Sequence, residues 1–297
     1  MTRITFIILL GLFICTCASC SEIHKKTKLE DLILKGKDVF FKDITFEDDI
    51  DFTEFSKNLI SEGVYQVRIT SSITFQNCTF NGSLIAYSKN ESDVILTSFQ
   101  SNLSFIGCIF NEDVNFRAAS VLGRTDFTNS AFNKTASFEE CTFFQNAYFR
   151  ASSYHEELRF QNAVFFQKAN FLHAEFDATA SFQQATFYGE AQFSSTKFIG
   201  YADFGLIRCH GNFFANYALF NDRAIFNSGL YNGKVDFINI SFNYVEIMNN
   251  QFNCETRFLK STVSDQLSFD NSFFLLGKPD ISSFDQEKVS LEGVIAR

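Results

Sequence analysis

The sequence lacks tryptophan and holds only one proline, two methionines and 14 glycines among its 297 residues. So little proline and glycine excludes a collagen-like chain and a chain built mainly from flexible linkers. Apolar residues make up 46% of the chain, which excludes global disorder. Positive charge is also scarce, since 25 Lys and Arg face 34 Asp and Glu and leave a net charge of −9. Proteins that bind nucleic acid need a basic face, so this balance argues against a nucleic-acid partner.

Phenylalanine is the residue in excess, with 41 copies that recur in a fixed pattern. From residue 94 to residue 242, large apolar residues follow one another in alternating steps of five and six. One series runs from Val94 through Phe105 to Phe237, and the other from Phe99 through Phe110 to Phe242, with Phe at 22 of the 28 positions. Such self-similarity at a fixed period predicts a repeat architecture.

A small residue precedes each large one by two positions, as Ala169 precedes Phe171 and Ala180 precedes Phe182. In an extended strand, residues two apart point to the same side, so each unit reads as a very short strand with one inward face. A helical coiled coil is excluded because five helical residues advance by about 500°, which moves successive Phe off one stripe. Four such units, alternating between five and six, make one coil with a period of 22. We therefore expect Phe105, Phe127 and Phe149 to stack in one ladder, and Phe116, Phe138 and Phe160 in the opposite one.

Segments such as Ala169-Asn170-Phe171-Leu172-His173-Ala174-Glu175-Phe176 carry the pattern A-x-F-x-x-A-x-F. This pattern resembles the pentapeptide-repeat family in its Phe-centred variety. The resemblance covers most of residues 39–275 and implies an all-β fold, the right-handed quadrilateral β-helix. The six-residue step departs from the family pattern, and we expect it to add one residue to every second corner.

Interruptions of the repeat predict local departures from a regular coil. Residues 53–68 and 81–93 break the period and are expected to leave the solenoid as excursions. Phe213 stands at a small position and Ala215 at the following large one, which we interpret as a swap that conserves volume. Two five-residue steps in a row, Phe242 to Ile247 to Phe252, predict a one-residue slip.

The open ends of a solenoid expose strand edges and need caps. Residues 20–38 are expected to supply a tether and a capping helix, because Leu29, Leu32 and Ile33 have helical spacing and Gly36 is a suitable stop. Residues 276–297 contain the single proline, Pro279, and lose the period, so we expect them to cap the other end. End-to-end or side-by-side self-association is a further possibility for such a rod.

The first 19 residues have the character of a signal peptide, with Arg3 before an apolar run from Ile4 to Cys17. Ala18-Ser19-Cys20 resembles a bacterial lipobox, in which the cysteine is acylated and becomes the first mature residue. The usual leucine three places before that cysteine is replaced by Cys17. The favoured hypothesis is lipidation at Cys20, with simple secretion or an uncleaved anchor as alternatives. Ser21 in place of aspartate favours delivery to an outer membrane, if the source has one.

No pattern of reactive or metal-binding side chains stands out in the remaining sequence. Cys78, Cys108 and Cys141 occupy small inward positions and Cys209 a large one, which predicts buried free thiols. Cys108 and Cys141 are one and a half coils apart and should face opposite walls. The cysteines lack metal-binding spacing, and neither the four histidines nor the acidic segment 47–51 matches a zinc or calcium motif. We therefore expect no catalytic residue, no cofactor and no metal site.

The favoured function is a non-enzymatic, exported scaffold that is anchored to a membrane by lipid and binds an unknown protein partner. Some members of the resembled family mimic DNA and bind DNA gyrase, and the acidic charge fits that alternative, whereas the signal segment argues against it. A second alternative is an enzyme that acts on polysaccharide, as some β-helices do with clustered carboxylates. No outward ladder of carboxylates at 22-residue spacing is apparent.

Overall fold

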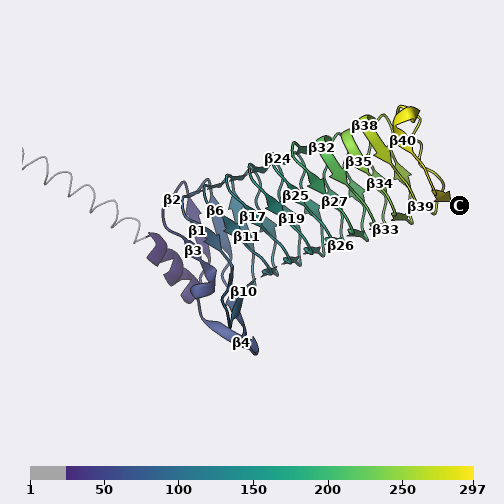
Figure 1. The fold of residues 1–297 in the computed structure, drawn as a ribbon. Helices are drawn as coiled ribbons and strands as arrows, with labels where there is room; N and C mark the ends of the chain where they lie inside the picture. The colour runs from purple at the N-terminus through teal and green to yellow at the C-terminus, as the bar shows by residue number, and fades with distance from the viewer. Residues whose placement is uncertain (1–24) are drawn as a thin grey trace, which may run out of the picture.

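The structure is a computed structural model that describes residues 25–297. It is a four-sided β-solenoid of about nine turns, so the predicted all-β pentapeptide-repeat β-helix is confirmed (Figure 1). Neighbouring coils pair through short parallel strands, and each coil crosses four walls in turn. We number these walls 1 to 4 in the order in which the chain reaches them.

The strands of each wall lie one above another along the solenoid axis. Wall 1 consists of β1 (Val39–Lys42), β6 (Ile73–Gln76), β11 (Leu103–Ile106), β15 (Thr125–Asp126), β19 (Ala147–Tyr148), β23 (Ala169–Asn170), β27 (Ala191–Gln192), β31 (Phe213–Phe214), β34 (Val235–Asp236) and β37 (Thr256–Arg257). Wall 2 consists of β2 (Thr45–Phe46), β7 (Thr79–Phe80), β12 (Ile109–Phe110), β16 (Ala131–Phe132), β20 (Ser153–Tyr154), β24 (Glu175–Phe176) and β28 (Lys197–Phe198).

Walls 3 and 4 complete each coil. Wall 3 consists of β3 (Ile50–Asp51), β8 (Leu84–Ile85), β13 (Val114–Asn115), β17 (Ala136–Ser137), β21 (Leu158–Arg159), β25 (Ala180–Ser181), β29 (Ala202–Asp203) and β40 (Val289–Ser290). Wall 4 consists of β5 (Val64–Ile69), β10 (Val94–Phe99), β14 (Ser120–Val121), β18 (Thr142–Phe143), β22 (Val164–Phe165), β26 (Thr186–Phe187), β30 (Arg208–Cys209), β33 (Leu230–Tyr231), β36 (Gln251–Phe252), β39 (Phe273–Phe274) and β41 (Ile295–Ala296).

Stacked phenylalanine rings fill the interior, as the 22-residue period predicts. Phe171 and Phe193 of wall 1 have ring centroids 4.7 Å apart and planes within 3° of each other. Phe182 of wall 3 meets Phe171 edge-to-face, with centroids 5.2 Å apart and planes at 84°. All three side chains are fully buried. Each such ring contributes about 2 kcal/mol of transfer free energy, and the parallel and perpendicular contacts add to it.

The two corner lengths have different backbone conformations. In residues 105–271, every positive-φ residue lies two places after an inward residue of wall 1 or wall 3, in a five-residue corner. At one such corner Tyr217 has φ of 61°, and the Ala218 amide donates a hydrogen bond to the Ala215 carbonyl (3.1 Å). This tight turn needs a left-handed third residue. The six-residue corners have the extra residue that was predicted and make the turn without a left-handed residue.

The one-residue slip is confirmed near the C-terminal end, where walls 2 and 3 merge. Three long strands, β32 (Leu219–Ile225), β35 (Ser241–Glu246) and β38 (Thr262–Ser268), run through the corner between these walls. Pairing of β32 with β35 shifts register between Phe220 and Arg223. Strand β35 therefore has one residue fewer than β32 at this corner, and the register shift accommodates the difference within a continuous strand.

The swap at Phe213 and Ala215 is also confirmed. Phe213 is in register with Ala191, which occupies a small position one coil earlier. Both Phe213 and Ala215 are buried, and the Phe213 ring lies 5.5 Å from that of Phe193. The large side chain thus fills the interior from the neighbouring position.

The two excursions contribute to one projecting flap, but the second is shorter than expected, because residues 84–86 of the segment 81–93 stay in wall 3. Strand β4 (Lys57–Ser61) pairs antiparallel with β5, β5 pairs parallel with β10, and β9 (Tyr87–Lys89) pairs antiparallel with β10. The 3-10 turn η1 (Phe52–Glu54) leads into this flap, which projects to one side of the first coils (Figure 1). The interpretation of Val94 as an inward residue was wrong, because Val94 is half-buried in the flap. Its spacing of 11 from Phe105 is a coincidence, and Ala86 occupies that inward place.

A helix covers the open end of the first coil. Residues 25–34 are helical, and Leu29 and Ile33 join the core of the solenoid. The helix ends at Gly36, with φ of 62°, where the Gly36 amide bonds to the Ile33 carbonyl and the Lys37 amide to that of Leu32, both at 2.9 Å. These two bonds are a Schellman motif, which favours glycine at the left-handed position.

The C-terminal residues differ from the expected irregular cap. Strands β40 and β41 pair with β38 and β39, so two walls keep the 22-residue step through residues 289–296. The short 3-10 turn η2 (Gln286–Lys288) leads into β40, and Phe284 is buried near the Phe258 ring. The end of the solenoid is thus a partial coil.

Candidate functional surfaces

The predicted lipidation residue, Cys20, lies outside the described residues, as does the whole segment 1–19. The structure therefore leaves lipidation as a prediction. Within residues 25–297, no helix is both long enough and apolar enough to cross a membrane.

The five cysteines of the described chain are buried free thiols. Cys108 lies on wall 2 and Cys141 on wall 4, as the spacing predicted. Cys78 and Cys108, however, occupy the same small position in adjacent coils of wall 2, because Thr79 is in register with Ile109. Contact between the two thiols lowers the pKa of Cys78 and raises that of Cys108, with burial adding to the rise. The spacing in the sequence does not reveal this pair, because the excursion within residues 81–93 makes the coil between the two cysteines longer than 22 residues.

Histidines and acidic residues contact neighbouring coils. His155 Nδ1 lies 2.6 Å from an oxygen of Asp177, one coil later. In the acidic segment 47–51, Asp49 accepts a hydrogen bond from the Ser83 amide (2.7 Å), and Asp51 accepts one from the Thr53 amide at the start of η1 (2.7 Å). In the described part of the chain, no three His, Cys, Asp or Glu side chains gather closely enough to hold a metal ion.

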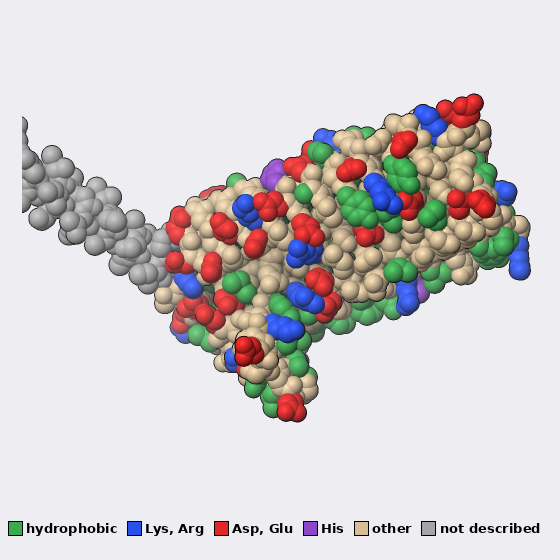
Figure 2. All heavy atoms as spheres, in the orientation of Figure 1, with side chains coloured by type: hydrophobic (Ala, Val, Ile, Leu, Met, Phe, Trp, Pro, Cys, Tyr) green, Lys and Arg blue, Asp and Glu red, His purple; other side chains and the backbone are tan. Residues whose placement is uncertain are grey.

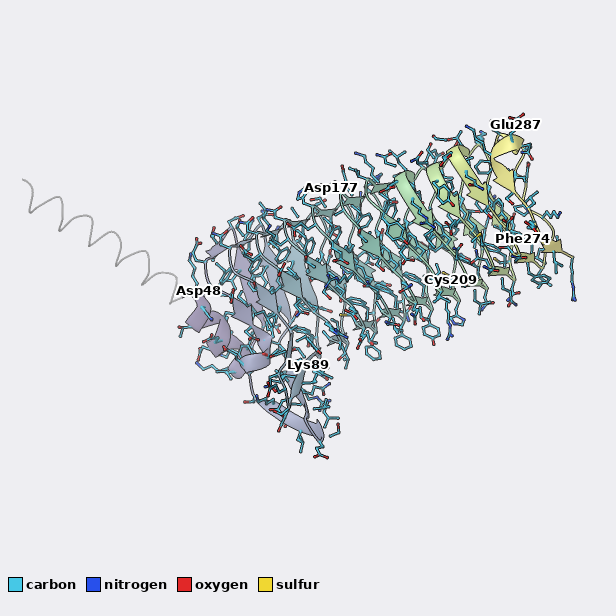
Figure 3. The ribbon with its side chains drawn as sticks, viewed as in Figure 1. Asp48, Lys89, Asp177, Cys209, Phe274 and Glu287 are labelled. Atoms are coloured by element: carbon cyan, nitrogen blue, oxygen red, sulfur yellow. The ribbon has the colours of Figure 1, made fainter. Side chains whose placement is uncertain are left out.

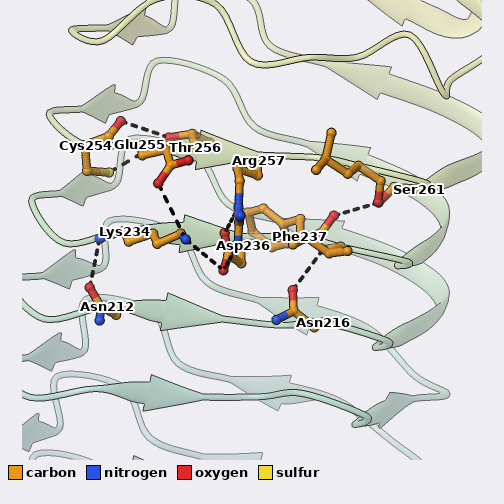
Figure 4. Close-up of polar contacts among 12 residues, drawn as sticks. Asn212, Asn216, Lys234, Asp236, Phe237, Cys254, Glu255, Thr256, Arg257 and Ser261 are labelled. Atoms are coloured by element: carbon orange, nitrogen blue, oxygen red, sulfur yellow. Dashed lines mark hydrogen bonds and ion pairs between the residues drawn. The ribbon is translucent and has the colours of Figure 1, made fainter.

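Asp236 on wall 1 is a deeply buried carboxylate, only 4% exposed (Figure 4). Its two carboxylate oxygens accept hydrogen bonds from Arg257 Nε and Nη2, each at 2.6 Å. Lys234 Nζ lies between Asp236 (3.7 Å) and Glu255 (3.5 Å). The carboxylate is thus compensated by two cations, which suits a role in joining coils better than a role in proton transfer.

A second buried carboxylate, Glu246, lies in the strand that joins walls 2 and 3. Burial acts to raise its pKa, but hydrogen bonds from Asn227, Arg223 and Tyr244 outweigh that effect and lower it. Asn227 Nδ2 donates at 2.8 Å and the Tyr244 hydroxyl at 3.1 Å. Glu246 is therefore held in its charged form within a network of donors.

Charges on the outer walls are paired from one coil to the next. Lys134 Nζ lies 2.8 Å from Glu156, and Lys168 Nζ lies 2.8 Å from Glu190, with the acid one coil after the base in each pair. Acidic and basic side chains are accordingly interspersed on the face seen in Figure 2. These surfaces form alternating charges and not a continuous acidic stripe.

Wall 4 bears a groove of about 660 Å³ that crosses several coils. Its floor follows the outward residues in register on four successive strands, Thr186, Arg208, Leu230 and Gln251. One rim consists of corner residues between walls 3 and 4: Asn162, Gln184, Leu206, Ser228 and Asn249. Cys209, next to the floor residue Arg208, is labelled near the lower edge of the solenoid in Figure 3.

His210 forms the opposite rim of the groove. It is the last ring of an exposed ladder along the corner between walls 4 and 1, which consists of Phe144, Phe166, Tyr188 and His210, each one coil after the last. Successive centroids lie 5.1, 5.1 and 4.8 Å apart, and the ring planes agree within 14°. Phe144 and Phe166 are each 40% exposed and Tyr188 is 48% exposed. The ladder is thus an exposed aromatic strip that meets the polar groove at His210.

Sequence reasoning missed this groove, although part of its signal was present. The 22-residue spacing that defines the inner ladders also applies to the residue after each inward residue of wall 4, which gives Phe144, Phe166 and Tyr188. No spacing pattern in the sequence marks Arg208, because its place in the groove depends on how the neighbouring side chains are arranged.

Comparison with known proteins gives one family match. Residues 97–142 match the family model described as pentapeptide repeats (9 copies). No curated protein and no solved structure matches the chain. The matched residues form part of the regular solenoid, and the same four-sided coil continues on both sides of them. The match to pentapeptide repeats is thus limited to residues 97–142, and the likeness of the other coils to that segment rests on the fold.

Proposed function

We propose that this protein is a non-enzymatic scaffold, exported and anchored by lipid at Cys20, that presents the walls of a rigid rod to a partner. The observation that carries the proposal is the ladder of inward rings through all four walls. It uses the interior entirely for packing and leaves function to the outer side chains. Wall 1 alone has ten strands, which corresponds to a rod of about 45 Å at the usual strand spacing.

The environment of the titratable groups supports a scaffold. Asp236 is paired with Arg257, Glu246 accepts three hydrogen bonds, and His155 contacts Asp177. A general acid or base needs a pKa suited to proton transfer and access to a substrate. Groups that join one coil to the next fit a structural role. The interspersed wall charges also favour a scaffold over the DNA-mimic alternative, which requires extended negative charge.

The anchor is proposed from the sequence of residues 1–21. The described helix that covers the first coil, residues 25–34, lies only a few residues after Cys20 in the sequence. An acylated Cys20 would therefore hold that end of the rod beside the membrane, with the later coils further away. Two or more acyl chains hold a protein firmly, whereas one anchors only marginally.

Membrane fractionation of Cys20→Ser and Cys15→Ser variants tests the anchor, with the mass of each chain measured. The Cys20→Ser chain should leave the membrane fraction or accumulate as uncleaved precursor, because the acylated thiol is lost. The matched Cys15→Ser chain should remain with the membrane, because Cys15 lies outside the segment that resembles a lipobox. A cleaved Cys20→Ser chain that stays with the membrane as the wild type does would contradict lipidation at Cys20. Crosslinking followed by pull-down from the native membrane fraction tests the scaffold role, and recovery of the chain alone would contradict it.

A further inference from the structure

We propose that the groove on wall 4 binds a polysaccharide that carries carboxylates, with Arg208 pairing one of them. The inference rests on the proposed scaffold function and names the wall and the class of ligand. It does not depend on the lipid anchor. Four features of the groove carry it: an unpaired cation, a lining without acids, a floor without free backbone groups and an aromatic rim at His210.

Arg208 differs from the arginines that join neighbouring coils. Arg117, Arg159 and Arg257 each pair with a carboxylate at 2.8 Å or less. The exposed Arg208 side chain has no hydrogen bond or ion pair with any residue between 25 and 297. A guanidinium matches the two oxygens of a carboxylate through parallel hydrogen bonds. Because Arg208 lies on the groove floor, the donor groups of its guanidinium are open to a ligand.

The groove lining contains no Asp or Glu, although the chain has 34 of them. An anion can therefore approach Arg208 without a carboxylate beside it. The polar lining consists mainly of neutral groups, including the amides of Gln184 and Gln251 and the hydroxyls of Thr186 and Ser228. Amides both donate and accept hydrogen bonds, as hydroxyls do, so they complement the hydroxyl groups of a sugar.

The backbone of wall 4 favours a sugar chain over an extended peptide. Peptides that bind sheets usually add a strand at a free edge, using main-chain hydrogen bonds. Along the groove floor those groups already join the coils, since the Arg208 amide donates to the Ala185 carbonyl (3.0 Å) and the Leu230 amide to the Ile207 carbonyl (2.9 Å). A ligand must therefore bind through side chains, which repeat at the coil spacing of about 4.8 Å. A sugar unit of a polysaccharide advances by a similar distance.

The aromatic rim provides the apolar contact. Tyr188 and His210 stack with centroids 4.8 Å apart, and His210 lines the groove. Sugar rings have apolar C–H surfaces as well as hydroxyl groups, and protein sites for small polar ligands commonly combine apolar walls with a few placed polar groups. The rim and Arg208 thus suit two sides of an acidic sugar unit.

Calorimetric titration of the purified full chain with oligogalacturonate tests the proposal. The matched ligand is the same oligomer with its carboxyl groups methyl-esterified, and the matched protein is Arg150→Gln. Arg150 is also exposed and unpaired, but it lies after Phe149 at the corner between walls 1 and 2. We expect binding of the acid oligomer only. Arg208→Gln should weaken it by about tenfold or more, the size expected for a lost charge-assisted contact, and Arg150→Gln by about twofold at most.

Three results would overturn the proposal. They are the absence of binding by the wild type, equal binding of the esterified oligomer, and equal loss in the Arg150→Gln and Arg208→Gln variants. Tighter binding of an oligoglutamate peptide through Arg208 would assign the groove to an acidic peptide instead. Each result leaves the anchor at Cys20 to be decided by fractionation, so failure of this inference and failure of the anchor are distinguishable.

Discussion

Phe171 and Phe193 stack almost parallel across adjacent coils, with centroids 4.7 Å apart, although a full coil of sequence separates them. Phe171 also contacts the rings of Phe149, at 4.9 Å, and Phe182, at 5.2 Å. It thus joins three coils of the interior. The stability of the solenoid should therefore depend on single inward rings.

Substitution of Phe171 by alanine should lower the free energy of unfolding by about 3–5 kcal/mol, because it removes a buried ring and leaves a cavity. Phe171→Asp should cost more, since it also buries an unpaired charge. Chemical denaturation measures both. Phe166→Ala is the control, because Phe166 is 40% exposed and should cost less than about 1 kcal/mol. Similar losses for Phe166→Ala and Phe171→Ala would contradict the inward assignment.

The swap at Phe213 and Ala215 predicts that these two positions compensate for each other. Phe213→Ala alone should lose about 3 kcal/mol from a cavity, and Ala215→Phe alone should overpack the interior and cost about 1–3 kcal/mol. The double variant restores the usual small-then-large order. Its loss, measured by a double-mutant cycle, should be smaller than the sum of the two. Simple additivity would contradict an exchange of volume between these sites.

Left-handed corners carry backbone strain that glycine would relieve. Tyr217 has φ of 61° and its side chain is 65% exposed, so it is strained and contributes little to the core. Tyr217→Gly removes a left-handed cost of about 1–2 kcal/mol and adds about 0.5–1 kcal/mol of unfolded-state entropy, for a net gain near 0.5–1 kcal/mol. Thermal unfolding checks it. The control Leu219→Gly, in strand β32, should lower the melting temperature, and a similar drop for Tyr217→Gly would argue against strain at the corner.

The Asp236–Arg257 pair should matter more than the exposed pairs of the outer walls. Asp236→Ala removes the carboxylate that Arg257 holds through two hydrogen bonds, while Lys234 keeps Glu255. It should cost about 2 kcal/mol, as loss of charge-assisted hydrogen bonds does. Lys134→Ala breaks an ion pair whose side chains are almost half exposed, so it should lower stability far less than Asp236→Ala does. Urea denaturation compares the two variants. An equal, small effect would indicate that solvent screens Asp236 as well.

The adjacent thiols of Cys78 and Cys108 should join when the chain folds under oxidising conditions. Refolding in a glutathione redox buffer supplies the oxidant: glutathione disulfide is reduced to two thiols while the two cysteines lose two hydrogens and form one bond. Neighbouring strands lie within the Cα separation that a disulfide needs. Peptide mapping should find Cys78 linked to Cys108 and Cys141 free. Persistent free thiols at both sites, or a link to Cys141, would contradict this pairing.

The regular period explains which parts of the fold were predictable. Inward residues such as Phe105 and Phe116 are constrained by packing at every coil, so their spacing appears directly in the sequence. The swap at Phe213 and the slip after Phe242 were also visible, since each conserves volume or shifts one residue. The assignment of Val94 to the interior was wrong, because a strand of the flap has an apolar residue 11 positions before Phe105 by coincidence. The flap pairings depend on contacts between separate excursions, which no local pattern records.

The outer surface was less predictable, because wall residues are free to vary without loss of the core. The paired charges of Lys134 and Glu156 lie one full period apart in the sequence, so the coil length could have revealed them. Arg208 differs from the paired arginines only in what surrounds it. The contact of Cys78 with Cys108 required knowledge of the long coil between them. Site prediction therefore failed where it needed side-chain neighbours across coils.

The decisive measurement for the proposed anchored scaffold is the intact mass of the protein purified from native membranes. We expect a mature chain that begins at Cys20 and carries a diacylglyceryl group, with Ser21 as the second residue. The matched Cys20→Ser protein should lack that added mass. A mature wild-type chain that begins at or after Cys20 without lipid would contradict the anchor and favour simple secretion.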